Sequence, residues 1–172
     1  MGTAPALRDT PPMRATPVLV LAFLGACGGA PTPAPTSGPP TAASSPASAC
    51  LALADTPRVK KPGEPARISV KHILVKYAGA KNASPSITRT REEACLRALQ
   101  ARDALRTGAE VEAVVKEYSD EAGAESRGGS MGPVERKDLV PPFADAAFEL
   151  SVGEFSDVVE TDFGFHVISR YQ

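Results

Sequence analysis

Proline is unevenly distributed along the 172 residues, and this limits where a compact domain can lie. Residues 1–66 hold 13 of the 17 prolines, whereas the remaining 106 residues hold four. Because proline fixes φ and has no backbone N–H, no ordinary core tolerates the density found in the first part. We therefore expect one folded domain over residues 67–172, a length typical of single domains.

Residues 28–66 are expected to form a disordered tether. The stretch Ala30–Ala49 within them is built almost wholly from Ala, Pro, Ser, Thr and Gly. Such a composition buries too little apolar surface to offset the entropy lost on ordering. The sequence therefore predicts a flexible, partly extended connection in front of the domain.

The apolar run Val18–Leu24 lies between Arg14 and Cys27 and has the features of an export signal. It is far shorter than the ~20 residues that span a bilayer as a helix, so it fits a cleaved signal peptide better than an anchor. The four residues Leu24–Cys27 resemble the bacterial lipobox. In that motif the cysteine thiol receives diacylglycerol and becomes the first residue of the mature protein.

Residues 1–27 are accordingly expected to be a leader and lipoprotein signal peptide. Met13 is the expected true start, because residues 1–12 add nothing to the signal. The alternative is an ordinary secretory signal in which Cys27 is incidental. Gly28 stands where an aspartate would favour retention in the inner membrane. We expect a protein of the cell envelope, lipid-anchored at the outer membrane and facing the periplasm.

Two further cysteines, Cys50 and Cys95, could form a disulfide in an oxidising compartment. Cys50, however, lies in the predicted tether, whereas Cys95 lies on the apolar side of a predicted helix. We therefore expect a buried free thiol at Cys95. Neither cysteine has the His or Asp neighbours expected of a nucleophile.

The charges of the predicted domain exclude some functions. Residues 67–172 hold 14 Lys and Arg against 17 Asp and Glu, and a mildly acidic domain is a poor partner for nucleic acid. The chain has only two histidines, with no close acid or thiol set, which does not make a zinc site. We expect no metal and no cofactor.

Alternating apolar residues predict a strand over Arg67–Tyr77, and both of its faces are apolar enough to be covered. A capping box over Thr90–Glu93 predicts the start of a helix, with Gly108 at its C-terminal cap. Apolar spacing predicts a second helix over Val111–Tyr118. These elements place a strand and two helices in the first half of the domain.

The second half of the domain opens with the glycine-rich turn Arg127–Gly132, which leads into a short strand. A short helix over Ala144–Leu150 follows two prolines. Val158–Glu160 and Phe163–Tyr171 are predicted to form a closing hairpin. The order of elements predicts an α+β domain built on a small antiparallel sheet.

Four separated segments resemble, in order and spacing, the parvulin (PpiC or rotamase) family of peptidyl-prolyl cis-trans isomerases. The segments are Val70–Lys76, Tyr118–Asp120 with Gly128–Gly132, Pro142–Phe148, and Val152–Ile168. The resemblance covers nearly all of residues 67–172. It implies a four-stranded antiparallel sheet flanked by about four helices, and an enzyme that acts on X-Pro bonds of polypeptides.

The chemistry of that reaction asks for an apolar pocket. Rotation about an X-Pro bond faces a barrier of ~18–20 kcal/mol because of amide resonance, and no bond is broken. A catalyst has to hold the proline ring, exclude water and favour the twisted state. The resemblance places the proline pocket at Met131, Leu139 and Phe143. The alternative for these three residues is simple core packing.

The resemblance also assigns polar residues to the site. His72 and His166 match the paired active-site histidines of the family, and we favour a supporting role for them over direct catalysis. Glu121 follows a Ser-Asp pair where the family has Cys or Asp. Glu121 keeps the carboxylate of those family members that have Asp at this position, and it argues against covalent catalysis. Thr161 and Phe163 match turn positions that border the site.

Some members of the family grip phosphoserine or phosphothreonine with a basic cluster. Lys76 and Lys81 occupy comparable places here, but Asn82 follows and no arginine pair is present, so the sequence favours substrates without phosphate. We expect a monomeric isomerase that acts on exported proteins. The alternative function is a catalytically weak chaperone or docking module of the cell envelope that binds peptide in the same pocket.

Overall fold

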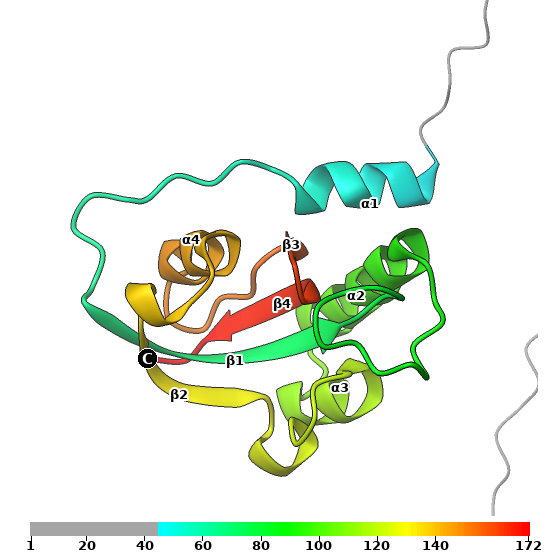
Figure 1. Cartoon of the computed structure of the whole chain (residues 1–172). Helices are drawn as coiled ribbons and strands as arrows, with labels where there is room; N and C mark the ends of the chain where they lie inside the picture. Colours follow the sequence, from blue (N-terminus) through cyan, green and yellow to red (C-terminus); the bar gives the residue numbers. More distant parts are fainter. Residues whose placement is uncertain (1–44) are drawn as a thin grey trace, which may run out of the picture. The chain divides into compact units, whose positions relative to one another are not determined.

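The computed structural model describes residues 45–172, so the predicted signal, the lipidated Cys27 and the first part of the tether lie outside the described residues. A four-stranded antiparallel sheet with the order β2-β1-β4-β3 forms the centre of the domain (Figure 1). Its strands are β1 (Arg67–Val75), β2 (Ser130–Glu135), β3 (Val159–Thr161) and β4 (Gly164–Arg170).

Four helices in residues 45–172 surround the sheet. They are α1 (Pro46–Ala54), α2 (Arg91–Arg106), α3 (Val111–Tyr118) and α4 (Pro141–Glu149), with single 3-10 turns at Glu125–Arg127 and Arg136–Asp138. Of these helices, α1 and α2 begin at the side-chain caps Ser45 and Thr90. The Thr90 hydroxyl accepts the Glu93 N–H, and the Glu93 carboxylate accepts the Thr90 N–H, so the predicted capping box is confirmed. Helix α4 starts at Pro141 and not at Ala144, because prolines fit the first turn of a helix without losing a hydrogen bond.

Strand β1 has a hydrophobic cluster on each of its faces, as its alternating apolar residues predict. Ile73 and Val75 pack under α2 and α3, while Ile68 and Val70 pack against α4 on the opposite face. Strand β4 alternates in the same way, so the α4 side of the sheet receives every second residue of both central strands. This shared face positions the candidate site.

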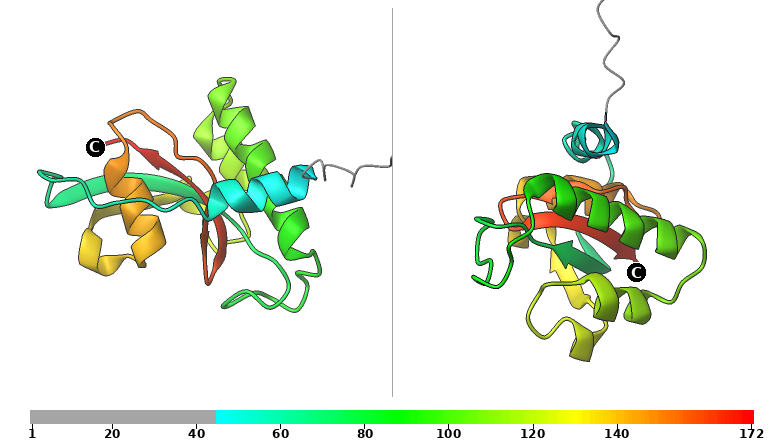
Figure 2. Two further views of the ribbon diagram at one scale, coloured as in Figure 1. Left: turned by 90° about the horizontal axis from the view of Figure 1, so that it is seen from above. Right: turned by 90° about the vertical axis from the view of Figure 1, so that its right-hand side faces the viewer.

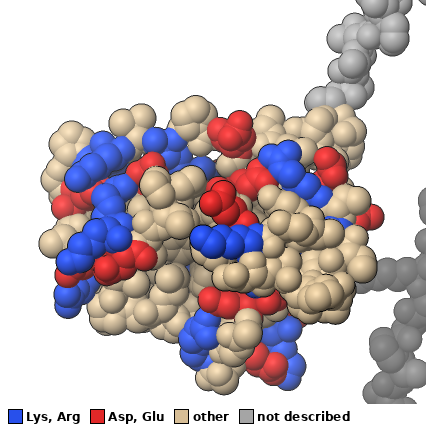
Figure 3. Space-filling view, viewed as in Figure 1, with Lys and Arg blue, Asp and Glu red and all other residues tan. Residues whose placement is uncertain are grey.

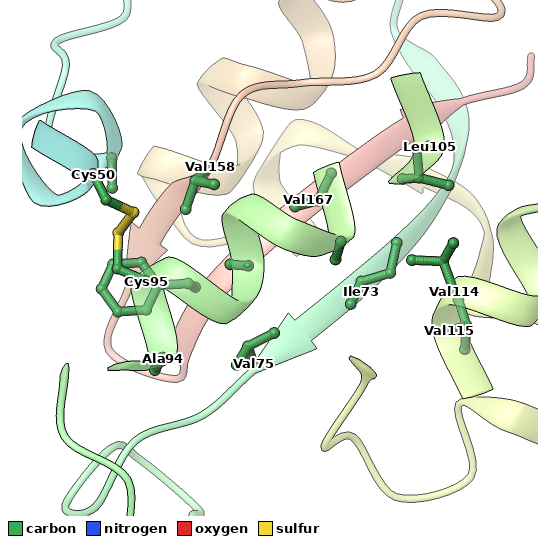
Figure 4. Packing of buried hydrophobic residues seen from close by; sticks show 14 of the residues in the cluster. Cys50, Ile73, Val75, Ala94, Cys95, Leu105, Val114, Val115, Val158 and Val167 are labelled. Atoms are coloured by element: carbon green, nitrogen blue, oxygen red, sulfur yellow. A yellow bond between two sulfur atoms is a disulfide. The ribbon is translucent and has the colours of Figure 1, made fainter. Parts of the chain in front are cut away.

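Helix α1 corrects two predictions. Residues 46–54 were expected to lie in the disordered tether, but they form a helix that lies against α2 (Figure 2). Cys95 was expected to be a free thiol, but it forms a disulfide with Cys50, with their Cα atoms 6.0 Å apart. Figure 4 shows this bridge joining α1 to α2 at one edge of the hydrophobic core. The tether prediction is therefore wrong for residues 46–54.

The physical reason for both errors is tertiary contact. A nine-residue helix is marginal alone in water, so α1 depends on what it packs against. Cys50 and Ala54 are nevertheless buried against α2, at 2% and 4% exposure. The disulfide also constrains the unfolded chain across a separation of 45 residues. Together these contacts order a segment that was assigned to the tether with its proline-rich neighbours.

Basic and acidic side chains are interspersed on the face shown in Figure 3. Where the segment 55–66 joins β1, the Glu64 carboxylate pairs with both Lys60 and Arg136, and Glu135 pairs with Arg67.

Within residues 45–172, no helix is both long enough and apolar enough to cross a membrane.

Candidate active site

The two histidines meet on the α4 face of the sheet, between the central strands. His72 lies opposite Ile168, and Leu74 lies opposite His166, so the imidazoles are diagonal neighbours on one face. Their Nδ1 atoms are 3.3 Å apart, and the rings are nearly parallel, with an angle of 10° between their planes. Each histidine is 4% exposed, so the pair is buried.

Hydrogen bonds extend from both ends of this pair. His72 Nε2 lies 2.9 Å from the Glu121 carboxylate, and His166 Nε2 lies 2.7 Å from the Thr161 hydroxyl. The Phe163 N–H donates to the same hydroxyl oxygen at 3.1 Å. These five groups, from β1, β3, β4 and two loops, therefore form one continuous chain of hydrogen bonds.

Proton positions in this chain follow from which groups can donate. The Thr161 oxygen accepts the Phe163 N–H, and the described residues offer the Thr161 hydroxyl hydrogen no acceptor except His166 Nε2. His166 then carries its proton on Nδ1 and donates to His72. His72 donates from Nε2 to the carboxylate. Every ring nitrogen in this chain of hydrogen bonds thus has a partner while both rings are uncharged.

Burial and hydrogen bonding shift two pKa values in this network. Burial, with a smaller contribution from His72, holds the pKa of His166 well below its ordinary value of 6.5. The hydrogen bond from His72 lowers the pKa of Glu121, and the Arg127 guanidinium, which pairs with the same carboxylate, lowers it further. Both shifts favour a neutral His166 beside an ionised Glu121.

A clasp between α3 and the end of β1 brings Glu121 to the histidines. The Asp120 N–H donates to the Leu74 carbonyl at 2.7 Å, and the Asp120 carboxylate accepts the Lys76 N–H at 2.8 Å. Arg89 pairs with the same carboxylate. The acid that follows Asp120 is therefore held beside the strand that carries His72.

A glycine is required behind His72. The Gly129 carbonyl accepts the His72 N–H at 3.0 Å, and Gly129 has a φ of 72°. A Cβ atom at this position would lie 2.6 Å from the His72 carbonyl oxygen, closer than real contacts allow. The predicted glycine-rich turn thus permits the close approach of β2 to the strand bearing His72.

A cavity of about 280 Å³ opens above the histidine pair. The Phe143 ring stands edge-on to both imidazoles, with centroids 5.5 Å from His72 and 5.1 Å from His166. Seven of the predicted site residues line this cavity: His72, Glu121, Met131, Leu139, Phe143, Phe163 and His166. Residues from five separate parts of the chain therefore converge on one hollow with a largely apolar wall.

The remaining predicted residues lie around the cavity and not in its wall. Thr161 is buried behind His166. Lys81 lies over the Phe163 ring, 5.0 Å from its centroid, and Lys76 Nζ donates to the Asn82 carbonyl. Neither lysine lines the cavity.

Sequence reasoning missed four residues of the site. Leu74, Asp138 and Val140 also line the cavity, and Arg127 pairs with Glu121. The period of the strand could have found Leu74, which lies two residues after His72. Arg127 lies in the glycine-rich turn with no spacing pattern that links it to Glu121. Within residues 45–172, no group of three or more His, Cys, Asp or Glu side chains is arranged to hold a metal ion.

Comparison with known proteins gives the family. The rotamase family model, described as the PPIC-type PPIase domain, matches residues 72–171. The chain belongs to this family. The Pin1 isomerase of Malus domestica is 37% identical over 113 residues, which are 60% of this chain and 93% of that protein. The ESS1 isomerase of Saccharomyces cerevisiae is 40% identical over 114 residues, 62% of this chain and 66% of that protein.

A solved structure agrees with this assignment. The peptidyl-prolyl isomerase ESS1 from Candida albicans superimposes with a TM-score of 0.58 at 29% identity, over 62% of this chain and 63% of that chain. The predicted parvulin-type fold is therefore confirmed, as is the prediction of an isomerase of this family. The rotamase match starts at His72, so α1 lies outside it.

The lowered pKa of His166 predicts a specific loss of stability in acid. The unfolded chain takes up a proton on this histidine near pH 6.5, whereas the folded domain does not. The stability that the buried neutral ring contributes is therefore complete above pH 6.5 and falls below it. We expect the difference in unfolding free energy between the parent and His166→Asn to be constant above pH 7. Below pH 6.5 it should shrink by up to ~1.4 kcal/mol per pH unit. Urea unfolding from pH 8 to 5 measures this, and a constant difference contradicts it.

Proposed function

We propose that this rotamase domain isomerises X-Pro bonds in exported, extended polypeptides by a non-covalent mechanism. The observation that supports it is the cavity beside the buried histidine pair, where Met131, Leu139 and Phe143 come together. These residues offer an apolar surface for a proline ring and no nucleophile. The three residues derive from β2, the loop before α4, and α4 itself.

The proposed mechanism lowers the rotation barrier by changing the surroundings of the amide. A planar amide is stabilised by resonance and by hydrogen bonds from water, and the twisted amide loses much of its charge separation. An apolar wall that excludes water therefore disfavours the planar state relative to the twisted one. Glu121 places a negative charge at the edge of this wall, which biases the amide electrostatically.

The histidines act, on this proposal, as support and not as acid or base. His166 is buried, with a lowered pKa, and all of its ring nitrogens are engaged within the chain of hydrogen bonds. Its role is to hold the sheet and the Phe143 ring at a fixed spacing. Thr161 fixes the orientation of His166 through its hydroxyl.

We further propose that the substrates carry no phosphate. The basic groups near the site are engaged elsewhere, since Arg89 pairs with Asp120 and Lys76 donates to a backbone carbonyl. Lys81 is left as a single cation over Phe163. One exposed lysine does not provide the paired donors with which proteins grip a phosphate dianion.

The domain is proposed to act as a monomer at the cell envelope, with Cys27 lipidated and the protein facing the periplasm from the outer membrane. The motif Leu24–Cys27 and the apolar run before it support this placement. Metabolic labelling with a radioactive or clickable fatty acid should mark the parent and not Cys27→Ser. Equal labelling of the two proteins would exclude a lipid on this cysteine.

Met131→Ala tests the pocket without disturbing the core, because Met131 is 38% exposed. We expect kcat/KM for an Ala-Pro peptide to fall about tenfold, which corresponds to ~1.4 kcal/mol of transition-state binding. The unfolding free energy should stay within about 0.5 kcal/mol of the parent. The matched control is Val152→Ala, which removes an exposed side chain outside the cavity and should leave kcat/KM unchanged.

Three outcomes of the same assay decide between the alternatives. Equal turnover by the parent and Met131→Ala would contradict the pocket. Peptide binding without any rate enhancement would favour the chaperone or docking module. A preference above tenfold for phosphoserine-Pro over Glu-Pro and Ser-Pro peptides would contradict the proposal on phosphate.

A further inference from the structure

Two more hollows continue from the cavity above the histidines. The first, of about 420 Å³, shares Val140 with that cavity and is also lined by Thr161, whose hydroxyl bonds to His166. The second, of about 350 Å³, shares Pro141, Pro142 and Asp55 with the first. The start of α4 therefore borders all three hollows, with Val140 and Phe143 in the wall of the cavity and Pro141 and Pro142 in the walls of the two added hollows.

The far end of this row is built by α1 and the residues after it. The second hollow is lined by the consecutive residues 54–58, and Asp55, which caps the C-terminus of α1, lines both added hollows. This wall lies outside the part of the chain that matches the rotamase family, which begins at residue 72. One side of the groove formed by the two added hollows is therefore built by residues outside the family match.

The Cys50–Cys95 disulfide holds this wall in place. Only Cys50 and Ala54 are buried among the nine residues of α1. A helix so short, with so little buried surface, depends on its attachment to α2. Cleavage of the bridge would leave residues 46–58 weakly held, and the two added hollows would lose one side.

We propose that the two added hollows bind the polypeptide segment flanking the proline that occupies the cavity, and that the disulfide maintains this extended subsite. This inference rests on the proposed isomerase function. The occupant is the substrate itself, because the first added hollow adjoins the cavity at Val140, where a chain leaving the cavity passes next to it. An extended chain spans ~3.3 Å per residue, so six flanking residues cover about 20 Å.

The test compares a short and a long substrate on the full-length chain. The short peptide has five residues centred on Ala-Pro, and the long one carries six further residues on each side. Line-shape or exchange NMR measures kcat/KM for each peptide with the parent, with Asp55→Trp and with the pair Cys50→Ser and Cys95→Ser. Asp55→Trp fills the groove while the disulfide stays intact. The matched control is Val59→Trp, at a site that is 80% exposed and lines none of the three hollows.

The parent should turn over the long peptide about tenfold better than the short one, equivalent to ~1.4 kcal/mol. Asp55→Trp and the cysteine variant should lose this preference and keep the short-peptide value, whereas Val59→Trp should retain both. An equal kcat/KM for the two peptides with the parent, or an unchanged preference in Asp55→Trp, overturns the inference.

Failure of the proposed function gives a different result, because neither peptide is then turned over. In that event fluorescence anisotropy of the labelled long peptide tests the groove alone. About tenfold weaker binding to Asp55→Trp than to Val59→Trp supports the groove. Equal binding to these two variants overturns it.

Discussion

The contact between two buried imidazoles is the constraint on which the rest of the site depends. His72 and His166 belong to adjacent strands, and a polar pair at 4% exposure is stable only when every ring nitrogen has a partner. Glu121 and Thr161 provide those partners at the two ends. The hydrogen bonds of Asp120 to β1 and the glycines of the turn bring these groups together. Phe143 then covers the pair and forms the wall of the cavity.

Much of this arrangement could be predicted because its signals are local. The alternation in β1 reports the period of a strand, and in the structure both of its faces are covered, as that pattern predicts. The Thr90–Glu93 capping box is a four-residue pattern with its own hydrogen bonds, and α2 begins there. Family resemblance located the cavity residues, which no periodicity distinguishes from ordinary core.

The features that escaped prediction depend on contacts between distant segments. Residues 46–54 adjoin the low-complexity stretch and were therefore included in the predicted tether, whereas burial against α2 and a bond to Cys95 order them as α1. Arg127, six residues after Glu121, pairs with it across the 3-10 turn Glu125–Arg127, and no spacing pattern links the two. The contacts of α1, in contrast, become visible only once the sheet and α2 have assembled. The groove that α1 completes is hidden from the sequence for the same reason.

The most direct test of the account is the position of the protons on the two imidazoles. Long-range nitrogen–proton NMR of the labelled protein distinguishes a protonated ring nitrogen from a bare one. The account predicts that His166 stays neutral at pH 7, with its proton on Nδ1 and a bare Nε2, while His72 carries its proton on Nε2. A proton on Nε2 of His166, or titration of that ring near pH 6.5, would contradict it.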